Sequence, residues 1–514
     1  MSAPTTKNEK EQNELKYVEE RGIKIKNEVA NIPSERSKLH NPKMAICREM
    51  TLLTLMVAVK DSKIKLGCLE GVSSSGLAAL QWKKMLKDKI DVTAATLDCL
   101  DSINVNCKNN YIHPIPFPLD FTRTPGITLP QQGEKEIHVC QARTNVLLHM
   151  EAFDFIFLDP HKSCTSYIDS VFVNLRHLGI LCLIVPDISM FARSHQVVER
   201  MYSAAVIKTD YIKELAARVI LGKLARSASQ CNKGLEVLYT QSVDDFLLLC
   251  VKVHRGPHIA DASNQNLRSV LHCRMCEERV ILEKQKAPVE NPYLLLPCTC
   301  NKEKIGKTAV VLGPIWAGPI FKPDFLVKMK NSSESLNLDK KSLSVLNAIL
   351  DEVEDSIETR AENSECNEEE VVDKDTKCDQ NTKQTENESV TNKNLESYTT
   401  KDNREHNGGT QNLKRPLDDN ENSNSPTKRP KRVDLKNKSE KELWDHHFIP
   451  FYYNTHRWKM DAAKKLPKLA ELIQLLKSDG FRASRTHFDS KCIRTDASLK
   501  QIAQTLKSHC NVYH

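Results

Sequence analysis

Residues 153–160 read Phe-Asp-Phe-Ile-Phe-Leu-Asp-Pro, and the fold prediction starts from this stretch. Five of its eight side chains are apolar and three of these are aromatic, which predicts a buried parallel strand. The run ends abruptly at Asp159 and Pro160. Open α/β sheets bind their ligands at the carboxyl ends of such strands. The simpler interpretation is a strand that stops where a proline follows it.

Apolar runs alternate with helix-like segments on both sides of this stretch. Further strands are predicted at residues 64–69, 90–96, 179–185 and 242–253, and a helix at 77–86. This alternation predicts an α/β fold with a doubly wound parallel sheet. Residues 111–136 are rich in proline and break the pattern, so we expect an inserted loop there.

The composition indicates a chain of several domains that folds in a reducing compartment. The 514 residues suffice for two or three domains, and the net charge of +7 permits a polyanionic partner without requiring one. No apolar run approaches a membrane span and the first residues are polar, so neither a signal peptide nor an anchor is expected. Many of the 17 cysteines lie inside apolar runs, as is usual where thiols stay reduced.

Changes in composition divide the chain into five predicted segments. They are a polar extension at 1–40 with helical stretches at best, the α/β domain at 41–255, a cysteine-bearing unit at 256–330, a linker at 331–440 and a C-terminal α+β domain at 441–514. The linker begins with an amphipathic helix at about 342–357. From about residue 360 it is almost free of aromatic side chains, which predicts disorder.

Two close cysteine pairs predict a structural zinc site. Cys273 and Cys276 are followed by Cys298 and Cys300, and two thiol pairs around a loop of about twenty residues suit tetrahedral Zn–S₄ coordination. Four protein ligands leave no open position, so such a zinc would be structural. Four free core thiols, or a redox pair, are the alternatives.

A glycine-containing turn follows the first predicted strand. Residues 70–76 read Glu-Gly-Val-Ser-Ser-Ser-Gly and lead into a helix. Glycines at such a turn let the backbone approach a nucleoside or a phosphate, which the helix N–H groups then face. The spacing differs from G-x-G-x-x-G, and taken alone an ordinary βα turn explains it equally well.

Two basic clusters lie in the predicted linker. Lys414-Arg415 and Lys428–Arg432 are separated by a twelve-residue spacer and resemble a bipartite nuclear localisation signal. They predict residence in the nucleus and recognition by the nuclear import machinery. Contacts to nucleic acid, or simple solubilising charge, are the alternatives.

Aromatic side chains alternate with Arg, Lys and His in the C-terminal segment, at 450–457, 481–488 and 493–496. This mixture suits an RNA surface, with cations for phosphates and rings for stacking. An ordinary core of aromatic side chains is the alternative. The predicted phosphate contacts are Arg457, Arg482, Arg485, His487 and Arg494, with Tyr452 or Tyr453 for stacking.

Together these motifs resemble the tRNA guanine-N2 dimethyltransferase family, and within it a diverged "dimethyltransferase-like" branch. The resemblance covers roughly residues 40–330 and 448–500. It rests on residues 41–44 with Arg48 and Glu49, on 153–160, on 213–218 through 231–234, on the two cysteine pairs, on 312–319, and on 484–488 with 494–497.

The resemblance implies a methyltransferase-type sheet and a C-terminal tRNA-binding domain. It implies S-adenosylmethionine as donor and methylation or dimethylation of a guanine N2 in tRNA. Asp159 would hold the exocyclic amine and Pro160 would shape the pocket, because methyl transfer from a sulfonium needs alignment more than covalent catalysis. The donor would contact Arg48, Glu70, Gly71, Gly76 and Asp98.

Several positions depart from the family pattern, and they cluster where the donor would bind. Leu77 follows the glycine turn in place of Arg, Thr96 stands where an acid is expected, and Arg143-Thr144 replaces Asp-Ala. His161-Lys162 replaces an aromatic residue and Gly. Each lost contact would cost on the order of 1–3 kcal/mol of donor binding. A tRNA-binding protein with an eroded donor pocket, acting in tRNA folding or as a scaffold, is therefore the alternative function.

Overall fold

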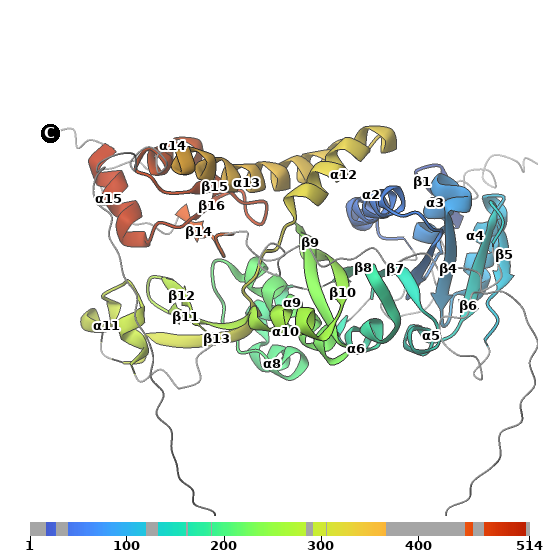
Figure 1. Cartoon of the computed structure of the whole chain (residues 1–514), viewed down its shortest axis with the longest axis horizontal. Helices are drawn as coiled ribbons and strands as arrows, with labels where there is room; N and C mark the ends of the chain where they lie inside the picture. The colour runs from blue at the N-terminus through green and yellow to red at the C-terminus, as the bar shows by residue number, and fades with distance from the viewer. Residues whose placement is uncertain are drawn as a thin grey trace, which may run out of the picture. The chain divides into compact units, whose positions relative to one another are not determined.

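An eight-stranded sheet forms the centre of the structure, in the order β5-β6-β4-β3-β7-β8-β10-β9 (Figure 1). The first six strands in this order, from β5 across to β8, run parallel to one another. Strand β10 is antiparallel to both β8 and β9. The predicted α/β class is confirmed. The strands are β3 (Leu66–Gly71), β4 (Ile90–Thr96), β5 (His113–Pro116), β6 (Glu136–Gln141), β7 (Phe153–Leu158), β8 (Leu175–Val185), β9 (Lys233–Val243) and β10 (Phe246–Arg255).

The computed structural model describes residues 17–26, 40–119, 132–160, 163–186, 188–283, 291–304, 306–365, 448–455 and 467–509. Most of the predicted disordered segment and both basic clusters lie outside these residues. Among the described residues, no helix has the length and apolar character that crossing a membrane requires.

Strand β7 lies inside the sheet, between β3 and β8, which explains its continuous apolar sequence. Phe155 and Phe157 are buried, and the ring of Trp82 meets them edge-on with centroids 5.6 and 6.1 Å away. Trp82 belongs to α3 (Leu77–Leu86), the helix that the sequence predicted after the glycine turn. The strand and its neighbouring helix therefore share one core.

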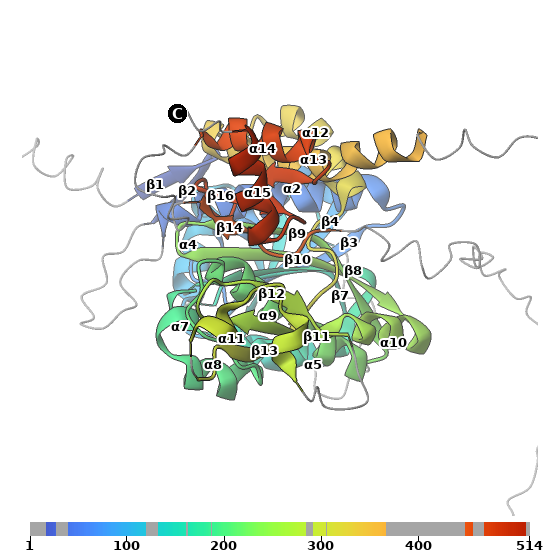
Figure 2. The ribbon, with the colours of Figure 1, turned by 90° about the vertical axis from the view of Figure 1, so that its left-hand side faces the viewer.

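Helices cover both faces of the sheet (Figure 2). Helices α2 and α12 pack on each other on one side, and α6 and α9 pack on each other on the other side. The helices of this region are α2 (Ala45–Asp61), α4 (Leu100–Asn109), α5 (Thr144–Met150), α6 (Thr165–Asn174), α7 (Ser189–Arg193), α8 (His195–Tyr202), α9 (Ile212–Gln230), α10 (Pro257–Gln265) and α12 (Pro323–Leu336). Short 3₁₀ turns occur at Pro42–Met44, Lys87–Lys89 and Pro292–Leu295.

Three local predictions were wrong. The strand expected at 242–253 is two strands, because β9 and β10 form a hairpin that turns at Asp244 and Asp245. The loop expected at 111–136 contains β5 at the sheet edge, where prolines are tolerated, and the start of β6. Within the polar extension, the described residues 17–26 form a hairpin of β1 (Tyr17–Glu20) and β2 (Ile23–Lys26), where helix at best was expected.

Two smaller antiparallel sheets follow the central one. The first has the order β12-β11-β13 and comprises β11 (Leu267–Cys273), β12 (Arg279–Ile281) and β13 (Ala309–Trp316), with α11 (Cys300–Glu303) nearby. The second has the order β14-β16-β15 and comprises β14 (Tyr453–Asn454), β15 (Ala483–Arg485) and β16 (Cys492–Thr495), with α14 (Leu469–Ser478) and α15 (Leu499–His509). The predicted helix at 342–357 lies within α13 (Lys340–Glu365).

Candidate active site and metal centre

A cavity of about 570 Å³ opens at the carboxyl edge of the central sheet. Strands β3 and β7 are paired and parallel. Glu70, near the end of β3, and Asp159, directly after β7, therefore lie at the same edge of the sheet. The wall is formed by residues 41–44, Arg48, 70–75, Leu77, Phe157, Asp159, Pro160, Pro186 and Phe246. A cavity of this size suits a small organic cofactor or a single nucleotide.

The β7 side of the cavity combines one carboxylate with flat apolar surfaces. Asp159 and Pro160 follow the last residue of β7, Pro186 follows β8, and Phe246 begins β10. A planar ring can pack against such walls while the carboxylate accepts hydrogen bonds from its edge. Residues 161 and 162 lie outside the described structure.

The turn after β3 is held by three hydrogen bonds. The N–H of Val72 donates to Thr144 Oγ1 at 3.0 Å, that of Ser73 donates to the Ala95 carbonyl at 2.8 Å, and that of Gly76 donates to Ser73 Oγ at 3.0 Å. Val72 itself has φ 60°. Thr144 was noted in the sequence only as a departure from the family pattern, and in the structure it fixes this turn.

Glu70 is buried at the end of β3 and accepts a hydrogen bond from the N–H of Ala79 at 3.0 Å. Burial raises the pKa of Glu70 to about 7, against hydrogen bonds from Ala79 and Ser73 that lower it. Gly71 leaves no room for a side chain, because a Cβ there would lie 2.4 Å from Leu158 Cδ2. Close packing of β3 on β7 therefore requires glycine at this position.

The N-terminal hairpin is joined to the cavity wall by an ion pair between Glu20 of β1 and Arg48 of α2. Arg48 Nε donates to Glu20 Oε1 at 2.8 Å, and His40 and Gln81 contact the same carboxylate at 3.0 Å. Burial alone would raise the pKa of Glu20, but the hydrogen bonds from Arg48 and His40 outweigh it and lower the pKa to about 2. Sequence analysis missed Glu20, and its only local signal is the polar–apolar alternation at 23–26.

The wall brings together Arg48, Glu70 and Gly71 with Asp159 and Pro160, which were predicted from distant motifs. Two other predicted donor contacts are not among the wall residues. Gly76 is the N-cap residue before α3, with φ 72°, and Asp98 is exposed beyond the end of β4.

The four cysteines predicted to bind zinc lie together. Their Sγ atoms are all within 4.8 Å of one another, with Cys273 at the end of β11 and Cys300 at the start of α11. None of the four forms a disulfide bond. The sulfurs of a Zn–S₄ tetrahedron with bonds of about 2.3 Å are separated by roughly 4 Å, so the donor set and its spacing fit this metal.

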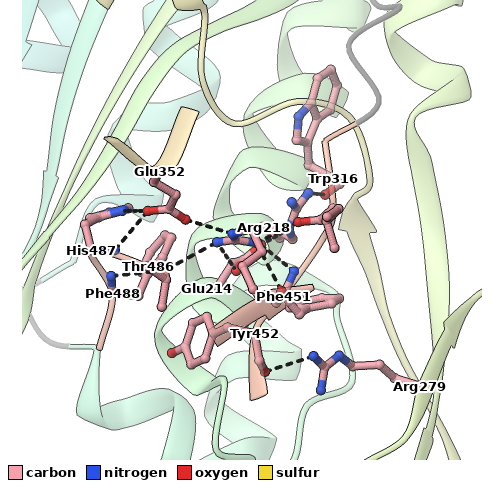
Figure 3. A network of polar contacts seen from close by, with 12 residues as sticks. Glu214, Arg218, Arg279, Trp316, Glu352, Phe451, Tyr452, Thr486, His487 and Phe488 are labelled. Atoms are coloured by element: carbon pink, nitrogen blue, oxygen red, sulfur yellow. Dashed lines mark hydrogen bonds and ion pairs between the residues drawn. The ribbon is translucent and has the colours of Figure 1, made fainter. Parts of the chain in front are cut away.

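Arg494 joins the C-terminal segment to two helices of the preceding chain. Figure 3 labels its partners Glu214 and Glu352. Its guanidinium donates to Glu214 on α9 at 2.9 and 3.2 Å and to Glu352 on α13 at 2.7 Å. It also donates to the carbonyls of Ile449 and Phe451 at 2.7 and 3.1 Å. Burial lowers the pKa of Arg494, but the two carboxylates outweigh burial and raise it.

A second arginine completes this network. Arg218 donates to Glu214 at 2.8 Å and to the carbonyls of Trp316 and Gly318 at 2.8 and 3.0 Å. Both arginines and both glutamates are 0% exposed. Two negative and two positive charges therefore neutralise each other in the interior, as buried ions require.

This network corrects the predicted RNA surface. Arg494 is fully buried, the His487 side chain is 2% exposed and bonded to Glu352, and Tyr452 is 1% exposed, so none of the three forms the exposed phosphate-binding or stacking surface that was predicted. Tyr453 is buried too, beneath Arg279, whose guanidinium lies 4.0 Å from its ring centre. Alternation of cations and aromatics at these positions reflects buried cation–π and ionic contacts.

The remaining predicted contacts differ in their placement. Arg485 is exposed, and Arg482 pairs with Asp496 at 2.9 Å. Arg457 lies outside the described residues.

Proteins with similar sequences are tRNA methyltransferases. The profile of the "N2,N2-dimethylguanosine tRNA methyltransferase" family matches residues 18–390 and 410–507. The human tRNA (guanine(27)-N(2))-dimethyltransferase is 34% identical over 482 residues, which is 93% of this chain and 61% of that protein. The tRNA (guanine(26)-N(2))-dimethyltransferase of Methanobrevibacter smithii is 24% identical over 331 residues, 64% of this chain and 78% of that protein. The chain thus spans less than two thirds of the length of its mammalian relatives.

A solved structure has the same fold. The complex of Trm1 from Pyrococcus horikoshii with S-adenosyl-L-methionine superimposes with a TM-score of 0.61 at 19% identity, covering 95% of this chain and 99% of that one. The central sheet is therefore of the methyltransferase type. With its profile match over most of its length, the chain belongs to the N2,N2-dimethylguanosine tRNA methyltransferase family.

Proposed function

We propose that this protein uses S-adenosylmethionine to methylate or dimethylate the N2 atom of a guanine in tRNA. The observation that carries the proposal is the cavity that unites Asp159 and Pro160 with the turn at 70–75 and Arg48. Its relatives named as tRNA guanine-N2 dimethyltransferases, at 33–34% identity over more than 90% of this chain, support it.

Asp159 is proposed to hold the exocyclic amine of the guanine. Its carboxylate would accept the amine hydrogens, which leaves the nitrogen lone pair directed away from Asp159. Its negative charge favours the positive charge that develops on the nitrogen during transfer. Pro160, Pro186 and Phe246 would bound the plane of the base, so the reaction depends on alignment more than on covalent catalysis.

The donor would occupy the β3 side of the same cavity. When bound, S-adenosylmethionine supplies the methyl group on a sulfonium centre. Glu70, the turn at 71–75 and Arg48 line that side, and Arg48 is held in place by its ion pair with Glu20. Thr144 keeps the turn in place. Gly76 and Asp98 stay predictions as donor contacts.

A structural zinc is proposed for Cys273, Cys276, Cys298 and Cys300. It would join the end of β11 to the start of α11 and stabilise a part of the chain that has only a small apolar cluster of its own. Residence in the nucleus through the clusters at 414–415 and 428–432 is proposed from the sequence alone.

Transfer of labelled methyl groups to tRNA from cells lacking the protein tests the activity, with calorimetry for donor binding. We expect Asp159→Ala to abolish transfer while donor binding persists, and Asp159→Asn to retain more transfer than Asp159→Ala because it keeps one acceptor. Asp261→Asn, which changes an exposed carboxylate on α10, is the control. No transfer by the wild-type protein, together with no donor binding, would leave a tRNA-binding protein without catalysis.

A further inference from the structure

A second cavity of about 600 Å³ lies between α13 and the C-terminal segment. We call it the α13 pocket and define it by the wall residues Ser242, Lys340, Asn347, Asp351, Arg485 and His487. Figure 1 shows α13 beside the sheet of β14, β15 and β16. The residues of this pocket have no part in the chemistry proposed above.

The α13 pocket is adjacent to the catalytic cavity across one hairpin. Ser242 near the end of β9 lines the pocket, and Phe246 at the start of β10 lines the catalytic cavity. These two residues lie at the tip of the same hairpin, where Val243 pairs with Phe246 and Ser242 pairs with Leu247. A ligand that extends past this tip therefore reaches both cavities.

The lining of the pocket matches the groups of an RNA backbone. Lys340 and Arg485 are exposed cations on opposite walls, and each can contact a phosphate. Asp351 adds a carboxylate, which repels a phosphate but accepts a hydrogen bond from a ribose 2′-hydroxyl. DNA lacks the 2′-hydroxyl, so the mixed lining favours RNA over DNA.

Two buried polar atoms of the wall have no partner among the described residues. They are Oγ of Ser242 and Nε2 of His487. The His487 side chain is 2% exposed and is fixed by the bond from its other ring nitrogen to Glu352 at 2.7 Å. Buried polar atoms are normally paired with protein groups, water or a ligand, so these two can form hydrogen bonds with a molecule held in the pocket.

The buried ion network connects the two walls of the pocket to each other and to α9. Glu352 follows Asp351 on α13, and it binds both His487 and Arg494 of the C-terminal segment. Arg494 in turn binds Glu214 on α9 beneath the central sheet. The spacing between the α13 pocket and the catalytic cavity is therefore set by paired charges in the interior.

We propose that the α13 pocket holds the tRNA strand next to the target guanine, with Lys340 and Arg485 on its phosphates, and so selects which guanine enters the catalytic cavity. The inference rests on the proposed function for the identity of the RNA. It assigns to this pocket the positioning of the substrate.

The test compares full-length Lys340→Ala/Arg485→Ala with Lys63→Ala/Lys89→Ala, which removes two exposed cations before β3 and β4, at the opposite edge of the sheet. We expect the pocket variant to raise the KM for tRNA several-fold, with kcat and donor binding unchanged. The slope of log affinity for tRNA against log salt should become less steep by roughly 1.4–1.8 for two lost phosphate contacts. The control variant should match the wild type.

The outcomes separate the two proposals. A pocket variant with the same KM and salt dependence as the control would overturn the assignment of the pocket. A wild-type protein that transfers no methyl group, with the salt dependence of tRNA binding still reduced in the pocket variant, would refute the enzyme and leave the RNA site standing. Equal loss of affinity for a single-stranded DNA of the same length would refute recognition of RNA by the 2′-hydroxyl.

Discussion

Neutralising Glu352 should destabilise the protein by about 3 kcal/mol. Burial alone would raise the pKa of this carboxyl group, but Arg494 and His487 outweigh it and lower the pKa to about 2, against an ordinary value of 4.5. One pH unit corresponds to about 1.4 kcal/mol, so this difference is worth about 3 kcal/mol. Breaking a buried ion pair from one side typically costs 3–5 kcal/mol, which agrees.

The sign of the pH dependence follows from the lowered pKa. Because the folded state binds the proton of Glu352 more weakly than the unfolded chain does, its contribution is complete above pH 4.5. It is lost as the pH falls from 4.5 through about 2. Glu352→Gln resembles the protonated acid at every pH, so the stability of this variant should lack that part of the acid dependence.

A double-mutant cycle measures the pair directly by urea unfolding at pH 7. Glu352→Gln leaves the two arginines facing only Glu214, whereas Glu352→Gln/Arg494→Met leaves Glu214 and Arg218 balanced. The double variant should therefore lose less stability than the sum of the two single variants, by about 1 kcal/mol or more. Glu354→Gln, an exposed change on the same helix, is the control. Additive effects, or a loss below about 0.5 kcal/mol for Glu352→Gln, would refute the reasoning.

Three further outcomes are expected. Cys298→Ser should lower the zinc content from about one ion per chain towards none and reduce the melting temperature. Cys231→Ser, outside the cluster, should change neither quantity. Equal zinc content in both variants would contradict the site. Thr144→Val should cost about 1 kcal/mol in unfolding experiments and weaken donor binding, because the partly buried N–H of Val72 loses its acceptor, whereas Thr144→Ser keeps the hydroxyl and should resemble the wild type. Alanine at the four basic residues of 428–432 should move a fluorescent fusion from the nucleus to the cytoplasm, and a fusion that stays nuclear would place the signal elsewhere.

Local patterns predicted the centre of the fold well. The strands at 90–96 and 153–158 and the helix at 77–86 have the predicted bounds, because alternating apolar runs and helical periodicity are properties of neighbouring residues. The cysteine spacing likewise placed four thiols that meet in space. The hairpin of β9 and β10 was missed because its turn, Asp244-Asp245, lies inside a run that is otherwise apolar.

The catalytic cavity was predictable in part. Glu70 and Asp159 lie at the carboxyl ends of two neighbouring parallel strands. These ends lie at the same edge of a sheet, regardless of the conformation of the loops that follow. Glu20 was not predictable, since its partner Arg48 is on another element and the hairpin that carries it is only four residues per strand. The role of Thr144 was not predictable either, because its hydroxyl accepts a hydrogen bond from a backbone N–H that is 72 residues away in the sequence.

Sequence patterns were sufficient to predict the α/β class, the order of its central elements, the four clustered thiols and the Asp159-Pro160 edge, because each depends on periodicity or on short spacing. The role of the C-terminal cations depends on long-range contacts and became clear from the folded chain. Arg494 and His487 have the composition of an RNA surface, yet they bind Glu352 from α13 and Glu214 from α9, which are 142 and 280 residues from Arg494. A cation beside aromatic rings is compatible with a phosphate or with a buried carboxylate, and the choice depends on which anion the folded chain brings within hydrogen-bonding distance.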